Sequence, residues 1–170
     1  MKDVITGKAF VYGANVDTDQ IYPGGYLDLT DPDLVAGHAM ERVDPGFAKE
    51  VKPGDMIVAG ANFGCGSSRE HAAVTLKASG IAAVLAESFA RIFYRNAINL
   101  GLPLLVCPGI AGLVKRGELL SVDLVAGQVT NQTTGASVTA QPLSAYVMAI
   151  LENGGVKPMI RKQRGLPGEG

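Results

Sequence analysis

The sequence has no tryptophan, two histidines and only two cysteines among its 170 residues. Cys65 and Cys107 lie far apart in the chain, and two cysteines are too few for a disulfide framework or a metal cluster. Two histidines and two separated cysteines also match no common zinc-ligand spacing. We therefore expect no metal site within this chain. Cys107 ends an apolar segment, which predicts a small buried side chain.

Excess charge and long apolar segments are missing as well. The formal net charge is -1 at pH 7, so nothing indicates a nucleic acid or an anionic membrane surface as the partner. No apolar run reaches the roughly 18 residues that a membrane-spanning helix needs. The first residues, MKDVITGKAF, lack the apolar core of a signal peptide. We therefore expect a cytoplasmic protein that binds neither nucleic acid nor membrane.

Strands and helices are predicted to alternate through the middle of the chain. Apolar segments at residues 56–60, 81–87 and 102–107 are typical of buried strands, and helical segments at about 68–79 and 88–101 separate them. This alternation predicts a parallel α/β arrangement. Another strand is expected at residues 4–12, two or three more at 119–143, and a closing helix at 143–155. We expect one domain, residues 1–155, followed by a basic C-terminal tail, residues 156–170, which is either loose or a docking segment.

The predicted helix at residues 88–101 carries two arginines. Ser88 is expected to cap it. Its apolar residues fall at helical spacing and are expected to face the core: Phe89, Ile92, Phe93, Ala97 and Leu100. Arg91 and Arg95 share another face. Because like charges four residues apart repel each other, we expect carboxylate partners nearby.

The stretch GANFGCGSSREHAA, residues 60–73, predicts an anion-binding site. Gly64 and Gly66 allow positive φ and close backbone approach. Ser67 and Ser68 stand where a loop would become a helix, and serine is a preferred cap there. Arg69 in the first turn opposes the helix dipole unless an anion offsets it. A glycine turn with a serine cap and a solvated arginine would need no ligand, and this interpretation stays open.

Three other polar features precede or overlap this stretch. The loop at residues 13–26 gathers Asp, Thr, Asp and Gln at positions 17–20, which is typical of turn chemistry or of a loop that lines a cleft. Farther on, Thr30 or Asp31 is expected to cap a helix that begins at Pro32 and carries His38. A separate hypothesis makes Cys65 a nucleophilic thiol with His71, although a nucleophile and a base so close in sequence rarely converge.

Three segments together resemble the swivel domain of the aconitase superfamily. They are TDQIYP at residues 18–23, GCGSSREHA at residues 64–72 and SFARIFYRNAINLGLP at residues 88–103. The match runs in the family's order through residues 1 to about 150. The SSREHA string is highly specific.

The resemblance implies a three-layer, swivelling β/β/α fold of the α/β class, with a mostly parallel sheet and additional antiparallel strands. It also implies the small subunit of a hydro-lyase, joined in a heterodimer or heterotetramer to a large subunit that carries a [4Fe–4S] cluster. Such an enzyme dehydrates and rehydrates a 2-hydroxy dicarboxylate through an alkene, with the cluster acting as a Lewis acid on the leaving hydroxyl. The two cysteines agree with a cluster held by the partner.

Roles for individual residues follow from their places in these motifs. Ser67 would be the base that removes a proton next to a carboxylate. Ser68 and Arg69 would bind a substrate carboxylate, and Thr18 and Asp19 would shape the loop beside them.

Substrate choice in this family depends on the loop after the Pro-Gly turn. In this chain that loop comprises Tyr26, Leu27, Asp28, Leu29 and Thr30. An aspartate would repel a third carboxylate, and leucines suit an alkyl branch, so isopropylmalate is favoured over homocitrate. Dimethylmalate or another alkylmalate stays open. The competing hypothesis from another class is a module that binds an anion or a protein partner without catalysis.

Overall fold

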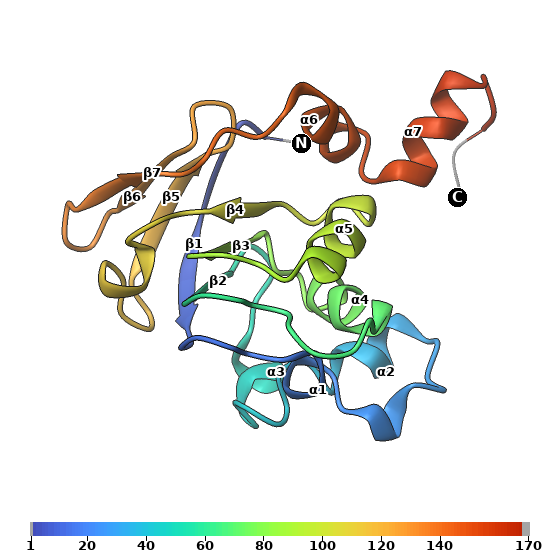
Figure 1. Cartoon of the computed structure of the whole chain (residues 1–170), viewed down its shortest axis with the longest axis horizontal. Coiled ribbons are helices and arrows are strands. Elements are labelled where there is room, and N and C mark those ends of the chain that lie inside the picture. The colour runs from blue at the N-terminus through green and yellow to red at the C-terminus, as the bar shows by residue number, and fades with distance from the viewer. Residues whose placement is uncertain (1, 168–170) are drawn as a thin grey trace.

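A seven-stranded sheet with a parallel part and an antiparallel part forms the centre of the computed structural model, which describes residues 2–167. The strand order is β4-β3-β2-β1-β5-β6-β7 (Figure 1). Strands β1 (Val4–Val11), β2 (Met56–Ala59), β3 (Ala83–Ala86) and β4 (Leu104–Val106) are parallel. Strands β5 (Leu119–Asp123), β6 (Gln128–Asn131) and β7 (Ser137–Thr139) continue the sheet in antiparallel pairs.

Strand β1 joins the two parts because each half of it pairs with a different neighbour. Its first residues, Val4 to Lys8, pair with β5, and its last, Ala9 to Val11, pair with β2. All residues of β2 and β3 are buried, as expected for parallel strands covered on both faces. In β5, half-buried and buried residues alternate. The strand predictions are therefore confirmed, with ends that shift by a few residues.

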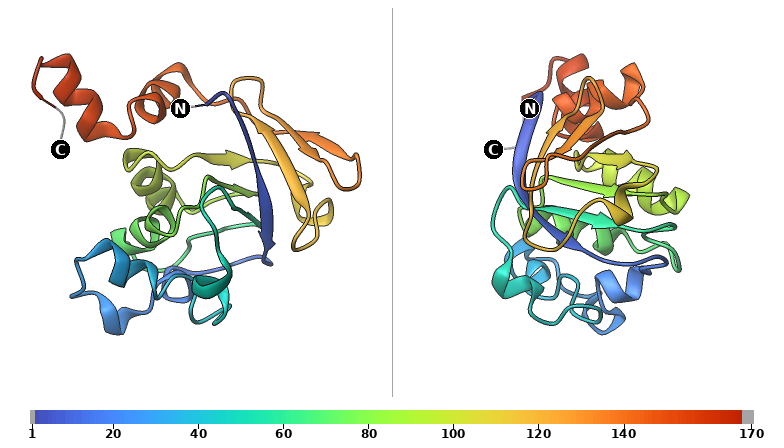
Figure 2. Two further views of the ribbon diagram at one scale, coloured as in Figure 1. Left: turned by 180° about the vertical axis from the view of Figure 1, so that it is seen from behind. Right: turned by 90° about the vertical axis from the view of Figure 1, so that its left-hand side faces the viewer.

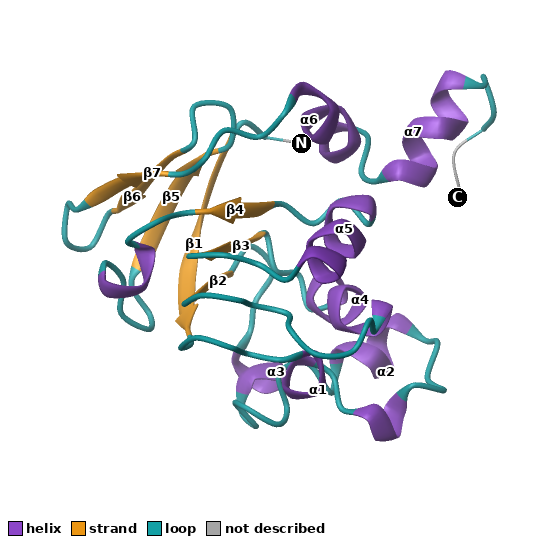
Figure 3. Ribbon diagram, viewed as in Figure 1, coloured by secondary structure: helices purple, strands orange, loops and turns teal. Residues whose placement is uncertain are grey.

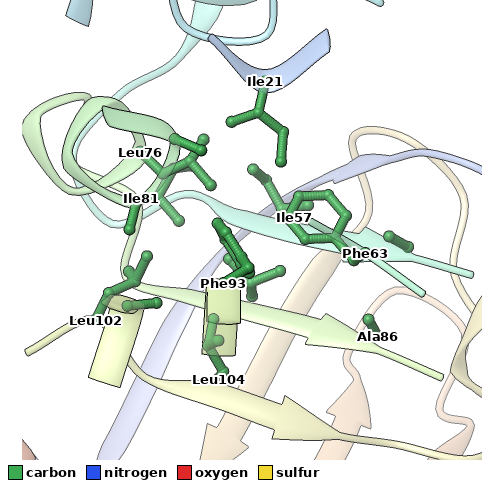
Figure 4. Close-up of a cluster of buried hydrophobic side chains, with 14 of the residues drawn as sticks. Ile21, Ile57, Phe63, Leu76, Ile81, Ala86, Phe93, Leu102 and Leu104 are labelled. Atoms are coloured by element: carbon green, nitrogen blue, oxygen red, sulfur yellow. The ribbon is translucent and has the colours of Figure 1, made fainter. Parts of the chain in front are cut away.

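Helices cover one face of the parallel strands and the antiparallel strands fold over the other. Along β2, Ile57 and Ala59 belong to a core cluster on the helix side, shown in Figure 4. Met56 and Val58 belong to a second cluster, shared with β5 and β6. The helices and the strands β5–β7 lie on opposite sides of the parallel strands in Figures 1 and 2. The expected three-layer β/β/α arrangement is confirmed.

The helices are short. The α-helices are α1 (Thr18–Ile21), α2 (Pro32–Ala36), α3 (Phe47–Glu50), α4 (Glu70–Ala78), α5 (Arg91–Asn99), α6 (Ala145–Glu152) and α7 (Val156–Gln163). Two 3-10 turns are η1 (Gly24–Tyr26) and η2 (Ile110–Gly112). Within residues 2–167, no helix is both long enough and apolar enough to cross a membrane.

Two predicted serine caps are wrong. Helix α4 begins at Glu70, with Arg69 at the N-cap position and no side-chain cap, so neither Ser67 nor Ser68 caps it. Helix α5 begins at Arg91 after Ala90, and the Ser88 hydroxyl instead accepts a hydrogen bond from the Asn62 N–H at 2.8 Å. In both cases a tertiary contact holds the chain extended for longer than local composition suggests.

Other differences concern helix ends and faces. Asp31 caps α2 and Pro32 is its first residue, as predicted, but α2 ends at Ala36, so His38 lies in the turn beyond it. Ile92, expected in the core, is 55% exposed. Residues of the expected tail form α7, and Met159 packs into the core cluster on the helix side. Residues 168–170 of that tail lie outside the described residues.

Candidate functional site

Three loops run side by side at the carboxyl ends of parallel strands. They follow β1, β2 and β3 and lead to α1, α4 and α5 (Figure 3). The loop after β2 lies between the other two. On one side, the Gly64 N–H donates to the Val16 carbonyl at 2.8 Å, and on the other the Phe63 N–H donates to the Ser88 carbonyl at 3.1 Å. Ligand sites of open α/β sheets lie at this edge.

The two glycines of the central loop permit this close packing. Gly64 has a φ of +84°, and a Cβ at this position would lie 2.3 Å from Cγ of Phe93 in α5. Gly66 has a φ of +99°, and its Cβ would lie 3.3 Å from Oγ1 of Thr18 in α1. The predicted positive φ and close approach are therefore confirmed at both positions.

Thr18 connects α1 to the central loop. Its hydroxyl is buried, donates to the Ser67 carbonyl at 2.9 Å and lies 3.3 Å from the Ser67 hydroxyl. Ser67 and Ser68 themselves are exposed. The Ser67 hydroxyl therefore has a fixed neighbour on one side and open space on the other.

The four polar residues at positions 17–20 have two different structural roles. Asp17 and Gln20 form a reciprocal capping box around α1, so the expectation of turn chemistry is confirmed for these two residues. Thr18 and Asp19 instead reach the central loop, as the cleft interpretation requires. The one-turn helix α1 was not predicted, although the Asp-x-x-Gln spacing is a capping-box signal.

Asp19 and Arg69 form an ion pair at the edge of the site. Arg69 Nη1 lies 2.7 Å from Asp19 Oδ1 and 3.3 Å from the Tyr22 carbonyl. A Cβ on Gly24 would lie 2.9 Å from Arg69 Nη2, so glycine leaves room for the guanidinium. Arg69 Nη2 and Nε make no hydrogen bond to any residue of the described chain. Arg69 is thus held on one side and keeps donors for an anion.

Asp19 is ionised at neutral pH. The hydrogen bond from Arg69, followed by that from the Gly24 N–H, holds the pKa of the Asp19 carboxyl below its ordinary value of 3.8. Arg42 Nε lies 3.5 Å from the other Asp19 oxygen, a contact that sequence reasoning missed. The carboxylate therefore offsets part of the positive charge around the loop.

Asp19→Asn should lower the free energy of unfolding by about 0.5 kcal/mol at pH 7, since Asp19 is 42% exposed and water screens the pair. The lowered pKa means that this stabilisation is present above pH 3.8 and is lost as the pH falls through the lowered value. Urea unfolding of the unmodified chain and of the Asp19→Asn variant, at pH 7 and at progressively lower pH, would measure the difference in the free energy of unfolding. A difference that grows on acidification would contradict the assignment.

A pocket of about 520 Å³ opens beside Ser67, on the α5 side of the central loop. It is lined by Gly64, Gly66, Ser67, Ala90, Arg91, Ile92 and Arg95. Ser68 and Arg69 do not line it. Ser67 and Arg69, which are predicted to act together, therefore lie on different sides of the central loop. Arg69 points towards α1 on one side, while Ser67 borders a pocket on the other.

The proposed substrate-selecting loop lies on the α1 side. The Tyr22 hydroxyl donates to the Tyr26 carbonyl at 2.6 Å, and Leu27 is 40% exposed. Asp28 and Thr30 are exposed, and Leu29 is half-buried. None of residues 26–30 lines the pocket beside Ser67.

The geometry argues against a Cys65–His71 pair. His71 Nε2 lies 3.3 Å from the Leu29 carbonyl, and its ring stacks on Tyr22 with centroids 5.3 Å apart. No hydrogen bond joins Cys65 to His71, both of which are described residues. The His71 ring thus supports the loop that contains Leu29.

Only one of the two thiols should react in the native chain. Burial, reinforced by the charge of Glu87, raises the pKa of the Cys107 thiol to about 12, and its side chain is fully buried, as predicted. Cys65 is half-buried. At pH 8, a disulfide reagent such as Ellman's should titrate one thiol per native chain and two after denaturation, because the thiolate is the reactive form. Cys65→Ser should remove the native reaction, and two rapidly reacting native thiols would contradict the burial of Cys107.

The described residues of this chain do not fit an iron–sulfur cluster. Cys107 is buried in the core cluster on the antiparallel side, whereas Cys65 lies in the central loop. Among residues 2–167 there is no group of three or more His, Cys, Asp or Glu side chains that could hold a metal ion.

Comparison with known proteins places these features in a family. Residues 13–108 match the model of the aconitase C-terminal domain. The 3-isopropylmalate dehydratase small subunit 1 of Methanopyrus kandleri is 55% identical over 163 residues, which are 96% of each chain. The isopropylmalate/citramalate isomerase small subunit of Methanocaldococcus jannaschii is 53% identical over 96% of this chain and 97% of its own.

The fold agrees with a solved structure. A crystal structure of a 3-isopropylmalate dehydratase from Methanocaldococcus jannaschii superimposes with a TM-score of 0.91 at 43% identity, covering 95% of each chain. The family model spans all three loops of the site, and the relatives match the chain almost from end to end. The chain therefore belongs to the aconitase superfamily, among the small subunits of the 3-isopropylmalate dehydratase type.

Proposed function

We propose that this chain is the small subunit of a hydro-lyase that interconverts 2-isopropylmalate and 3-isopropylmalate, a step of leucine biosynthesis. The observation that carries the proposal is the position of Ser67. Its exposed hydroxyl borders a pocket, lies 3.3 Å from Thr18 Oγ1, and has arginines on both sides of its loop. The names of the relatives supply the substrate.

The proposed reaction requires a base, and Ser67 can act as one only after its hydroxyl has lost its proton. Dehydration of 2-isopropylmalate transfers the proton of the carbon next to a carboxylate to Ser67, while the hydroxyl leaves the neighbouring carbon and an alkene forms. Rehydration in the opposite sense gives the 3-hydroxy isomer. Serine is a poor base unless positive charge stabilises its alkoxide, and arginines close to the loop supply such charge. The iron–sulfur cluster belongs to the large subunit in this proposal.

Ser68, Arg69 and the loop of residues 26–30 would bind and select the substrate. Arg69 offers the Nη2 and Nε donors that Asp19 leaves unused, and a guanidinium can bind a carboxylate with two parallel hydrogen bonds. Leu27 presents an exposed apolar side chain and Asp28 a negative charge. An alkyl branch is therefore preferred over a third carboxylate.

Co-expression with a cluster-bearing large subunit tests the proposal. The large chain should be one that is active with the small subunit of a relative, which serves as the positive control. Under anaerobic conditions we expect turnover of 2-isopropylmalate only when both chains are present, and little turnover of homocitrate. Citramalate and dimethylmalate define the range of alkyl branches that are accepted. Association of the chains without turnover of any of these substrates would contradict the proposal and support a non-catalytic binding module.

A further inference from the structure

We propose that Arg91 and Arg95 form a second carboxylate site, so that the two carboxylates of the dicarboxylate substrate are held on opposite sides of Ser67. This inference rests on the proposed function. Arg69 serves the α1 side of the central loop, and Arg91 and Arg95 serve the α5 side. A dicarboxylate held at both ends would be positioned across the Ser67 hydroxyl.

The two arginines have no counter-ion within the described chain. Both are exposed, stand four residues apart in α5 and line the pocket beside Ser67. Neither makes an ion pair or a side-chain hydrogen bond with any residue between 2 and 167, in contrast to Arg69 and Arg116, which have carboxylate partners. The carboxylate partners predicted for them are absent from this part of the chain. Their like charges repel each other until an anion arrives.

The site also lies at the start of the nine-residue helix α5. Arg91 is the first residue of that helix, where a cation opposes the helix dipole and a bound anion is favoured. The walls contributed by Gly64, Gly66 and Ala90 have little or no side chain, which leaves the volume open. About 520 Å³ is ample for a small dicarboxylate.

The remaining lining residue is apolar. Ile92 is 55% exposed and borders the same pocket as Arg91, Arg95 and Ser67. Two guanidinium groups, one exposed isoleucine and one hydroxyl match a carboxylate attached to a carbon chain better than a purely polar anion.

The test uses the assembled two-chain enzyme with the variants Arg91→Gln, Arg95→Gln and the double variant. Arg164→Gln is the matched control, because Arg164 is exposed at the end of α7 and its substitution removes the same charge. Each single site variant should raise KM for 2-isopropylmalate by about 10- to 100-fold, the usual value of a charge-assisted hydrogen bond. Arg→Lys at either position should restore part of the loss. The affinity between the two chains should stay unchanged.

A second measurement does not depend on activity. In the isolated ¹⁵N-labelled chain, 2-isopropylmalate should shift the Nε–Hε signals of Arg91 and Arg95 in a saturable manner. In the double variant, binding of 2-isopropylmalate beside Ser67 should be abolished. Unchanged KM and unshifted arginine signals would overturn the inference, while Ser67→Ala could still be inactive and the proposed function intact. Weaker association with the large subunit, at unchanged KM, would also overturn it and assign the arginines to the subunit interface.

Discussion

Ser67→Ala should reduce turnover of the assembled enzyme by about 10²- to 10⁴-fold and leave the two chains associated. This range is the usual contribution of a general acid or base. Ser67 is exposed, so the loss of its hydroxyl leaves no buried cavity, and the backbone carbonyl that Thr18 binds is kept. Anaerobic assay of kcat, together with the binding affinity of the two chains, measures the result.

Ser137→Ala is the matched control for that experiment. Ser137 is an exposed residue of β7 and makes no side-chain hydrogen bond within the described chain. Its substitution by alanine removes the same hydroxyl group. It should retain the activity of the unmodified enzyme. Near-normal turnover of Ser67→Ala would remove Ser67 as the base, and loss of association would mean that its role is structural.

Gly64→Ala should destabilise the fold by about 2–5 kcal/mol. Part of this cost is the left-handed backbone, since φ is +84°, which an alanine adopts at about 1–2 kcal/mol. The rest is a collision of the new Cβ with the Phe93 ring at 2.3 Å. Phe93 is buried and packs edge-on against Phe63 with centroids 5.4 Å apart, so it cannot move aside, and overpacking of this kind costs about 1–3 kcal/mol.

The control variant Gly135→Ala separates the cost of the left-handed backbone from the cost of the collision with Phe93. Gly135 has a φ of +82°, and a Cβ there would meet nothing within 4 Å. Urea unfolding should therefore show only the backbone cost of about 1–2 kcal/mol. If both variants lost the same stability, the contact between Gly64 and Phe93 would not restrict the central loop.

Most of the fold could be predicted because its signals are local. Continuous apolar segments marked the buried strands β2 and β3, and their alternation with helical segments indicated a parallel arrangement. Asp31 with Pro32 marked the start of α2 correctly. The string SSREHA pointed to the family to which the chain belongs.

The helix starts were predicted poorly because tertiary contacts compete with local capping. Ser67 was expected to cap α4, but its hydroxyl and its carbonyl face Thr18, 49 residues away in the sequence. Ser88 was expected to cap α5, but it accepts a hydrogen bond from Asn62. Residue patterns within one segment carry no information about such partners.

The sequence by itself determined which residue types stand at the carboxyl ends of the strands, because glycine, serine and arginine have intrinsic conformational and charge properties. Only the tertiary structure decided which of them meet. It pairs Arg69 with Asp19 on one side of the central loop and places Arg91 and Arg95 beside Ser67 on the other. The physical reason is that a parallel sheet brings together loops that are tens of residues apart, and the order of its strands sets which loops are neighbours.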